Sequence, residues 1–168
     1  MIQEGYVFVG RYETTFIFKA EGRLTQKSLW NANTAVQRCM EDQTITDLLV
    51  DITHCTYMDS TILGIIARWA ISFAKTHSSL PFLIGVHGNP LESTFRRMNL
   101  HTLFHVSQDS QLNEKWALSK LSLSEQYSKK EYAEYVLSAH TTLAELSSDN
   151  AREFAFVIQC LKSELNVE

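Results

Sequence analysis

The spacing of hydrophobic residues in the first hundred positions predicts strands that alternate with helices. Residues 6–9 and 15–18 are rich in β-branched and aromatic side chains, which are typical of strands. Between them, Gly10 and Arg11 are a turn signal and predict a hairpin. Denser apolar runs at residues 46–52 and 82–86 are typical of buried central strands.

Helical spacing of apolar residues appears between these predicted strands. It predicts helices over residues 28–40 and 60–75, and a short third helix over residues 90–98, where Pro90 lies in the first turn. Residues 103–106 are expected to form a last edge strand. This order predicts an α/β fold, a mixed β-sheet with crossover helices.

Composition divides the chain near residue 108. All six glycines and both prolines lie in the first hundred residues, and the absence of these turn-forming residues afterwards favours continuous helix. Residues 1–108 carry nine basic and nine acidic side chains, whereas residues 109–168 carry six and ten. We therefore predict a mixed domain over residues 1–108 and an acidic helical extension over residues 109–168.

The extension contains the signals of a helical hairpin. Ser128 and Glu131 have the spacing of a capping box, and either Asp149 or Asn150 is expected to cap a second helix. An earlier short helix is predicted around Trp116, Leu118 and Leu121. Two such helices are too small a core to be stable alone, so their apolar stripes need a further surface. The main domain of the same chain is the first expectation, and a homodimer is the second.

Charge and motif content exclude several functions. A net charge of −4 argues against nonspecific nucleic-acid binding, and no apolar run has the length needed to cross a membrane. No secretory signal is expected, so we predict a cytoplasmic protein with three unpaired thiols, no metal and no cofactor. The six histidines are scattered and are expected to face solvent. Phosphate-loop, dinucleotide-binding and nucleophile-elbow motifs are absent, so we expect neither catalytic residues nor an enzyme.

The most informative segment joins a buried strand to an amphipathic helix. A polar loop leads to Tyr57 and Met58, and then to Asp59, Ser60 and Thr61 at the expected helix start. Any of the last three can cap the helix, and Asp59 can also be read with Asp51 as a carboxylate pair, although capping explains both more simply. A hydroxyl at a helix N-terminus is also a favourable place for a phosphate, because free N–H groups and the helix dipole face it.

At this segment the sequence resembles the STAS domain, in particular the bacterial anti-sigma factor antagonists. Their motif, D-L-S-x-x-x-(F/Y)-(M/L)-D-S-(S/A)-G-(L/A)-G, is matched here by Asp51-Ile52-Thr53, Tyr57-Met58-Asp59-Ser60 and Leu63-Gly64. Weaker similarities lie at residues 20–24 and at residues 89–100. The resemblance covers residues 1 to about 108, and it implies crossover helices on one side of the sheet.

The resemblance also implies a phosphorylation switch. Ser60 corresponds to the phosphate acceptor, with Thr61 as the alternative. The unmodified form is expected to capture an anti-sigma factor, a serine kinase of the histidine-kinase-like ATPase type, and so to free a sigma factor for transcription. A PP2C-type phosphatase would reverse the modification. The residues that resemble the partner-binding surface are Gly22, Arg23, Asp59, Ser60, Thr61 and Ile62.

Ile62 departs from the family motif, which has glycine two residues after the acceptor serine. A β-branched residue there adds bulk beside the modified hydroxyl. Either the partner is adapted to it, or the chain is a STAS scaffold that is not phosphorylated, such as a subunit of a transporter or of a stressosome-like assembly. A hairpin docked on the main domain is expected to shape access to the surface around Ser60.

Overall fold

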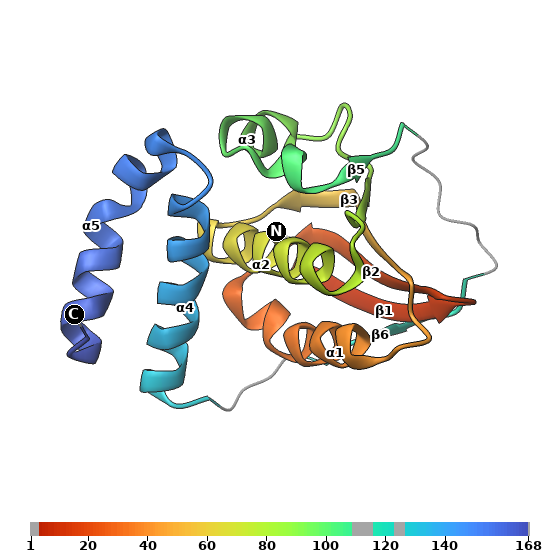
Figure 1. Cartoon of the computed structure of the whole chain (residues 1–168), viewed down its shortest axis with the longest axis horizontal. Helices are drawn as coiled ribbons and strands as arrows, with labels where there is room; N and C mark the ends of the chain where they lie inside the picture. Colours follow the sequence, from red (N-terminus) through yellow and green to blue (C-terminus); the bar gives the residue numbers. More distant parts are fainter. Residues whose placement is uncertain (1–3, 109–115, 123–126, 168) are drawn as a thin grey trace.

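A six-stranded mixed sheet organises the computed structural model, which describes residues 4–108, 116–122 and 127–167 (Figure 1). Its strands are β1 (Tyr6–Tyr12), β2 (Thr15–Arg23), β3 (Asp47–Tyr57), β4 (Phe82–Ile84), β5 (His105–Val106) and β6 (Leu118–Lys120). They lie in the order β5-β4-β3-β2-β1-β6. β2, β3, β4 and β5 pair in parallel, and β1 is antiparallel to both of its neighbours, β2 and β6.

Helices cover one face of this sheet, and a helical hairpin packs beside that layer of helices. The helical segments are η1 (Gln26–Leu29), α1 (Trp30–Glu41), α2 (Ser60–His77), α3 (Glu92–Arg97), η2 (Leu100–Leu103), α4 (Lys129–Ala144) and α5 (Ser148–Leu165). Figure 1 shows α1 and α2 packed against the same face, with α4 beside α2 and α5 outside α4. The predicted mixed sheet with crossover helices on one side and a C-terminal helical hairpin is confirmed.

The central strand β3 contributes side chains to both faces, as expected from the two-residue period of a strand. Leu48, Val50 and Ile52 are fully buried in the main core beneath the helices. Leu49 belongs to a smaller apolar cluster formed with Ile17, Ile84, Trp116 and Leu118. Burial on both faces explains why this strand is a nearly continuous apolar run in the sequence.

The β1–β2 turn was predicted at the wrong position. Gly10 lies inside β1, and the strands reverse at Glu13-Thr14, because Tyr12 pairs with Thr15. The glycine is needed for another reason. A Cβ on Gly10 would lie 2.6 Å from Leu118 Cδ2 and 2.7 Å from the Ala117 carbonyl oxygen. The absence of a side chain at Gly10 therefore leaves room for the segment that pairs with β1.

The short helix predicted around Trp116 is also wrong, because residues 118–120 form β6. Ser119 pairs with Val9, and the Leu121 N–H donates to the Val7 carbonyl. Pairing with an open strand edge outweighs the helix preference of so short a segment. Residues 109–115 and 123–126 of the predicted extension lie outside the described residues, and the boundary at residue 108 stays a prediction.

The helical hairpin forms largely as predicted, and it packs on the main domain. Ser128 and Glu131 form the capping box of α4. The cap of α5 is Ser147, and not Asp149 or Asn150. The reason is that Asn150 is buried, where its side-chain amide donates to the carbonyls of Met98 and Leu143. This amide joins the hairpin to the segment after α3.

The capping box gives α4 a measurable pH dependence. Hydrogen bonds from Ser128, chiefly from its backbone N–H, lower the pKa of Glu131. A carboxyl whose pKa is lowered by folding contributes stability above its unfolded pKa and loses it as pH falls through the folded pKa. In an NMR titration, the Ser128 amide proton should therefore move below about pH 4.3, the usual glutamate pKa. Glu131→Gln should abolish this movement, and a persistent movement in that variant would contradict the assignment.

Candidate functional site

At the junction of β3 and α2, the adjacent residues Asp59 and Ser60 have different roles. Asp59 is the N-cap, and its Oδ1 accepts the Ile62 N–H at 3.0 Å while its carbonyl accepts the Leu63 N–H at 3.1 Å. Among the three candidate caps, the structure thus selects Asp59. Ser60 begins the helix with a partly exposed side chain, and its hydroxyl is not used in this cap.

The Ser60 hydroxyl is instead paired with a histidine from α4. Its Oγ lies 2.9 Å from His140 Nε2, and His140 Nδ1 lies 2.8 Å from the Val136 carbonyl oxygen. A carbonyl only accepts hydrogen bonds, so Nδ1 carries a proton. In the neutral imidazole, Nε2 is then the acceptor and Ser60 is the donor. The arrangement places a proton acceptor directly against the serine hydroxyl.

His140 corrects the expectation that all six histidines face solvent. It is only 5% exposed, and its ring lies edge to face with Phe154 of α5 at a centroid distance of 5.3 Å. No local pattern in the sequence identifies Ser60 as the partner of this histidine, because the two residues are far apart along the chain. Its position on the apolar side of an amphipathic helix, one turn after Val136, is the one signal that it is buried.

The other residues predicted at the site lie in two environments. Thr61 and Ile62 are both buried, and Ile62 is part of the main core. Gln26 Nε2 of η1 lies 3.5 Å from the Thr61 hydroxyl. The side chain of Ile62 therefore adds no bulk to the surface beside Ser60, which removes the steric reason for regarding it as an obstacle.

Gly22 and Arg23 lie at the same end of the sheet as the Asp59–Ser60 junction. Arg23 pairs with Tyr57 across β2 and β3, and its guanidinium carbon lies 3.6 Å above the Tyr57 ring. Gly22 has a φ of +70°, and a Cβ there would lie 2.8 Å from the Glu4 carbonyl oxygen. The end of β2 and the start of α2 thus carry the predicted binding residues at one end of the sheet.

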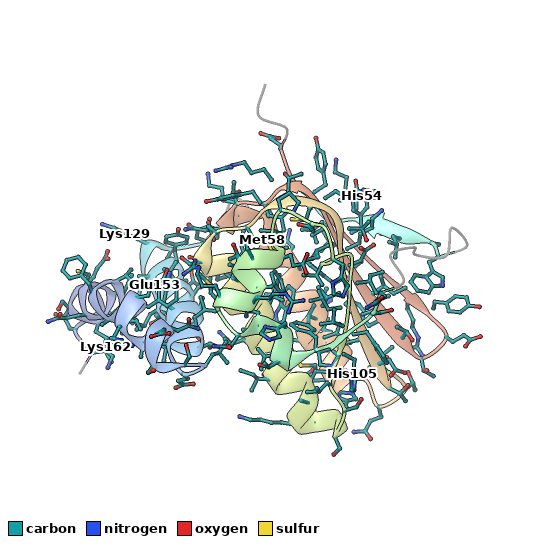
Figure 2. The ribbon with its side chains drawn as sticks, turned by 90° about the horizontal axis from the view of Figure 1, so that it is seen from above. His54, Met58, His105, Lys129, Glu153 and Lys162 are labelled. Atoms are coloured by element: carbon teal, nitrogen blue, oxygen red, sulfur yellow. The ribbon has the colours of Figure 1, made fainter. Side chains whose placement is uncertain are left out.

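An aromatic cluster lies between α1 and α4 on this side of the molecule. The Trp30 ring lies 5.0 Å from Tyr127 and 5.2 Å from Tyr135, and Tyr127 stacks on Tyr132 at 5.5 Å. Burial is the main cause that raises the pKa of Tyr132, and the Asp59 carboxylate and the ionised form of Tyr127 raise it further. In Figure 2, Met58 marks the junction, and Lys129 and Glu153 mark α4 and α5 beside it.

Other chemistry finds little support in the described ranges. Among residues 4–108, 116–122 and 127–167, the structure brings together no three His, Cys, Asp or Glu side chains able to hold a metal ion. Within the same ranges, none of the helices is both long and apolar enough to cross a membrane. The Asp51 carboxylate, weighed above as half of an acid–base pair, instead accepts the Thr53 N–H and hydroxyl at 2.8 and 2.6 Å.

Comparison with known proteins gives a likeness in structure. No family model and no curated protein matches the sequence. Among solved structures, the chain is similar to the anti-sigma factor antagonist SpoIIAA in its unphosphorylated form. The two share 12% identity with a TM-score of 0.49, over 62% of this chain and 89% of that one.

Proposed function

We propose that this chain is a STAS-type regulatory module that binds a protein partner around Ser60 and is switched by phosphorylation there. The observation that carries the proposal is that Asp59, and not Ser60, caps α2. Asp59 caps the helix, so the Ser60 hydroxyl can be modified without loss of the cap. The motif resemblance supports the same residue.

The proposed modification needs a nucleotide-dependent serine kinase, of the histidine-kinase-like ATPase type that the resemblance implies. Ser60 Oγ forms a bond to the γ-phosphorus of ATP, the bond from that phosphorus to the bridging oxygen breaks, and ADP leaves. The hydroxyl proton passes to a base of the kinase. A PP2C-type phosphatase restores the hydroxyl by hydrolysis.

Phosphate at this position changes the surface more than the fold. It adds a charge of about −1.5 to −2. The N-terminus of α2 favours negative charge through its dipole and its free N–H groups. We expect the sheet and α2 to remain folded, while a partner that contacts Asp59 and Ser60 meets a strongly altered charge.

The proposal is tested with a partner recovered from the native cell on the tagged chain, identified by mass spectrometry and purified. The same spectra should contain a phosphorylated Ser60 peptide. In calorimetry, Ser60→Ala should bind the partner at least as tightly as the wild type does. Ser60→Glu should bind at least about tenfold more weakly, a change of about 1.4 kcal/mol.

Ser163→Glu serves as the matched control, because Ser163 is exposed on α5 and the change adds the same charge away from the junction. This variant should bind like the wild type. Equal affinities of Ser60→Ala and Ser60→Glu would contradict the switch, and would favour the scaffold alternative that carries no phosphate.

A further inference from the structure

The surface around Ser60 is shaped to receive a helix in close contact. A Cβ on Gly64 would lie 2.2 Å from the Ala139 carbonyl oxygen, so the backbones of α2 and α4 touch at this point. Glycine inside a helix is destabilising relative to alanine. Its place in the middle of α2 is explained by this approach, because any side chain there would hold α4 away.

Three contacts follow one face of α2, at intervals of four residues. Ser60 contacts His140, Gly64 contacts Ala139, and Arg68 Nη1 donates to the Ser138 hydroxyl at 2.7 Å. Residues four apart on a helix lie on the same face. Ser60, the residue proposed to be phosphorylated, is therefore the first of three residues on the α2 face that α4 covers.

Hydrogen bonding is incomplete in part of the interface that α4 buries. The Tyr135 hydroxyl is buried without a hydrogen-bond partner among the described residues, which opposes the docked state. On the side of Arg68 away from Ser60, an open groove of about 580 Å³ lies between α2 and α4, and its lining includes Lys75, Glu134 and Thr141. The contact is tight near Ser60 and loose farther along.

The outer helix α5 packs along α4 but leaves most of its own apolar stripe only half-buried. Phe154 is the single side chain of the α5 apolar stripe that is buried, and Phe156 is 76% exposed. The stripe residues Val157, Ile158, Leu161 and Leu165 are half-buried. The hairpin is attached to the main domain by the α2 face, by the Trp30–Tyr135 ring contact, by the Asn150 amide on Met98 and by the Arg97–Glu153 ion pair. Loss of the α2 contact therefore removes its largest attachment.

We propose that α4 is a built-in competitor that covers the Ser60 surface, and that the external partner docks there with an amphipathic helix carrying a small residue opposite Gly64. This inference rests on the proposed function, whose site it concerns. While α4 is docked, the Ser60 hydroxyl faces a buried imidazole, so both partner binding and phosphoryl transfer require α4 to leave. Regulation of this module then includes opening of the hairpin as well as modification of Ser60.

The test uses the full chain and a probe copied from α4, a fluorescent peptide of residues 127–146. Ala139 is fully buried, so Ala139→Leu overpacks the interface of α4 and leaves the α2 surface unchanged, and α4 should undock. Hydrogen exchange should then lose protection in residues 129–144 and keep it in β2, β3 and α2. By fluorescence anisotropy, this variant should bind the peptide at least about tenfold more tightly than the wild type.

Two controls separate undocking from a general effect of the substitution. Ala155→Leu makes the same change at an exposed position of α5 and should bind the peptide as weakly as the wild type. Adding Gly64→Ala to Ala139→Leu should abolish peptide binding, because the methyl group blocks close approach of any helix. Unchanged protection of α4 in Ala139→Leu, or an open α4 without peptide binding, would overturn the inference. The peptide result does not depend on a phosphate, so the Ser60→Ala and Ser60→Glu comparison is decided separately.

Discussion

Replacing Gly85 with alanine should lower the free energy of unfolding by about 4 kcal/mol, a large share of the roughly 5–15 kcal/mol that stabilises a typical domain. Gly85 follows β4 with a φ of +80°, a conformation that costs an L-residue about 1–2 kcal/mol. A Cβ there would also lie 2.3 Å from Thr53 Oγ1 and 2.4 Å from the Thr53 backbone nitrogen. Thr53 is held by Asp51 through two hydrogen bonds, so it has little freedom to move away.

Gly88→Ala is the matched control for this prediction. Gly88 has a similar φ of +70°, but a Cβ there meets no atom within 4 Å. Its substitution should cost only about 1–2 kcal/mol, from backbone strain alone. Urea unfolding followed by circular dichroism measures both variants. Equal losses at the two positions would show that the contact with Thr53 contributes nothing.

Phe18→Ala should destabilise the protein by about 3–5 kcal/mol, because it removes a large, fully buried side chain from the main core. The ring of Phe18 lies edge to face with that of Trp69 on α2, at a centroid distance of 5.0 Å. The substitution therefore opens a cavity between the sheet and the helix that carries Ser60. Chemical denaturation gives the energy, and Trp69 fluorescence reports the change in packing.

Phe156→Ala makes the same chemical change at an exposed position. Its ring is 76% exposed on α5, so the free energy of unfolding should change by less than about 0.5 kcal/mol. If this variant loses as much stability as Phe18→Ala, α5 is buried in solution against a surface that the single chain does not show.

Local patterns in the sequence were sufficient for the elements that need no distant partner. The four-residue spacing of α2 and the Ser128–Glu131 box each contain their own signal, and both form where expected. The apolar run predicts the start of β3, but the strand continues to Tyr57 through residues that were predicted as a polar loop, because they pair with β2. The β1–β2 turn and β6 were predicted wrongly, because the role of Gly10 depends on a strand more than a hundred residues away. Long-range pairing is not visible in a local window.

In the candidate site, too, the local features were predictable and the long-range contacts were not. The Asp59–Ser60 junction was predicted from the strand-to-helix transition and from the family motif. The pairing of Ser60 with His140 was not predictable, since it depends on how α4 crosses α2. That crossing is fixed by the contact of Gly64 with Ala139, and the glycine was interpreted only as part of a motif.

The lengths of the outer strands have a consequence for handling the protein. β5 and β6 are two and three residues long, so the sheet offers only short runs of unpaired backbone to other molecules. β1 has seven residues, and its outer edge is paired through β6. A chain cut before Trp116 would expose the outer edge of β1 and promote aggregation by pairing of strand edges between molecules. Poor solubility of such a fragment would report the bare edge of β1, so a shortened chain that lacks α4 and α5 must retain β6.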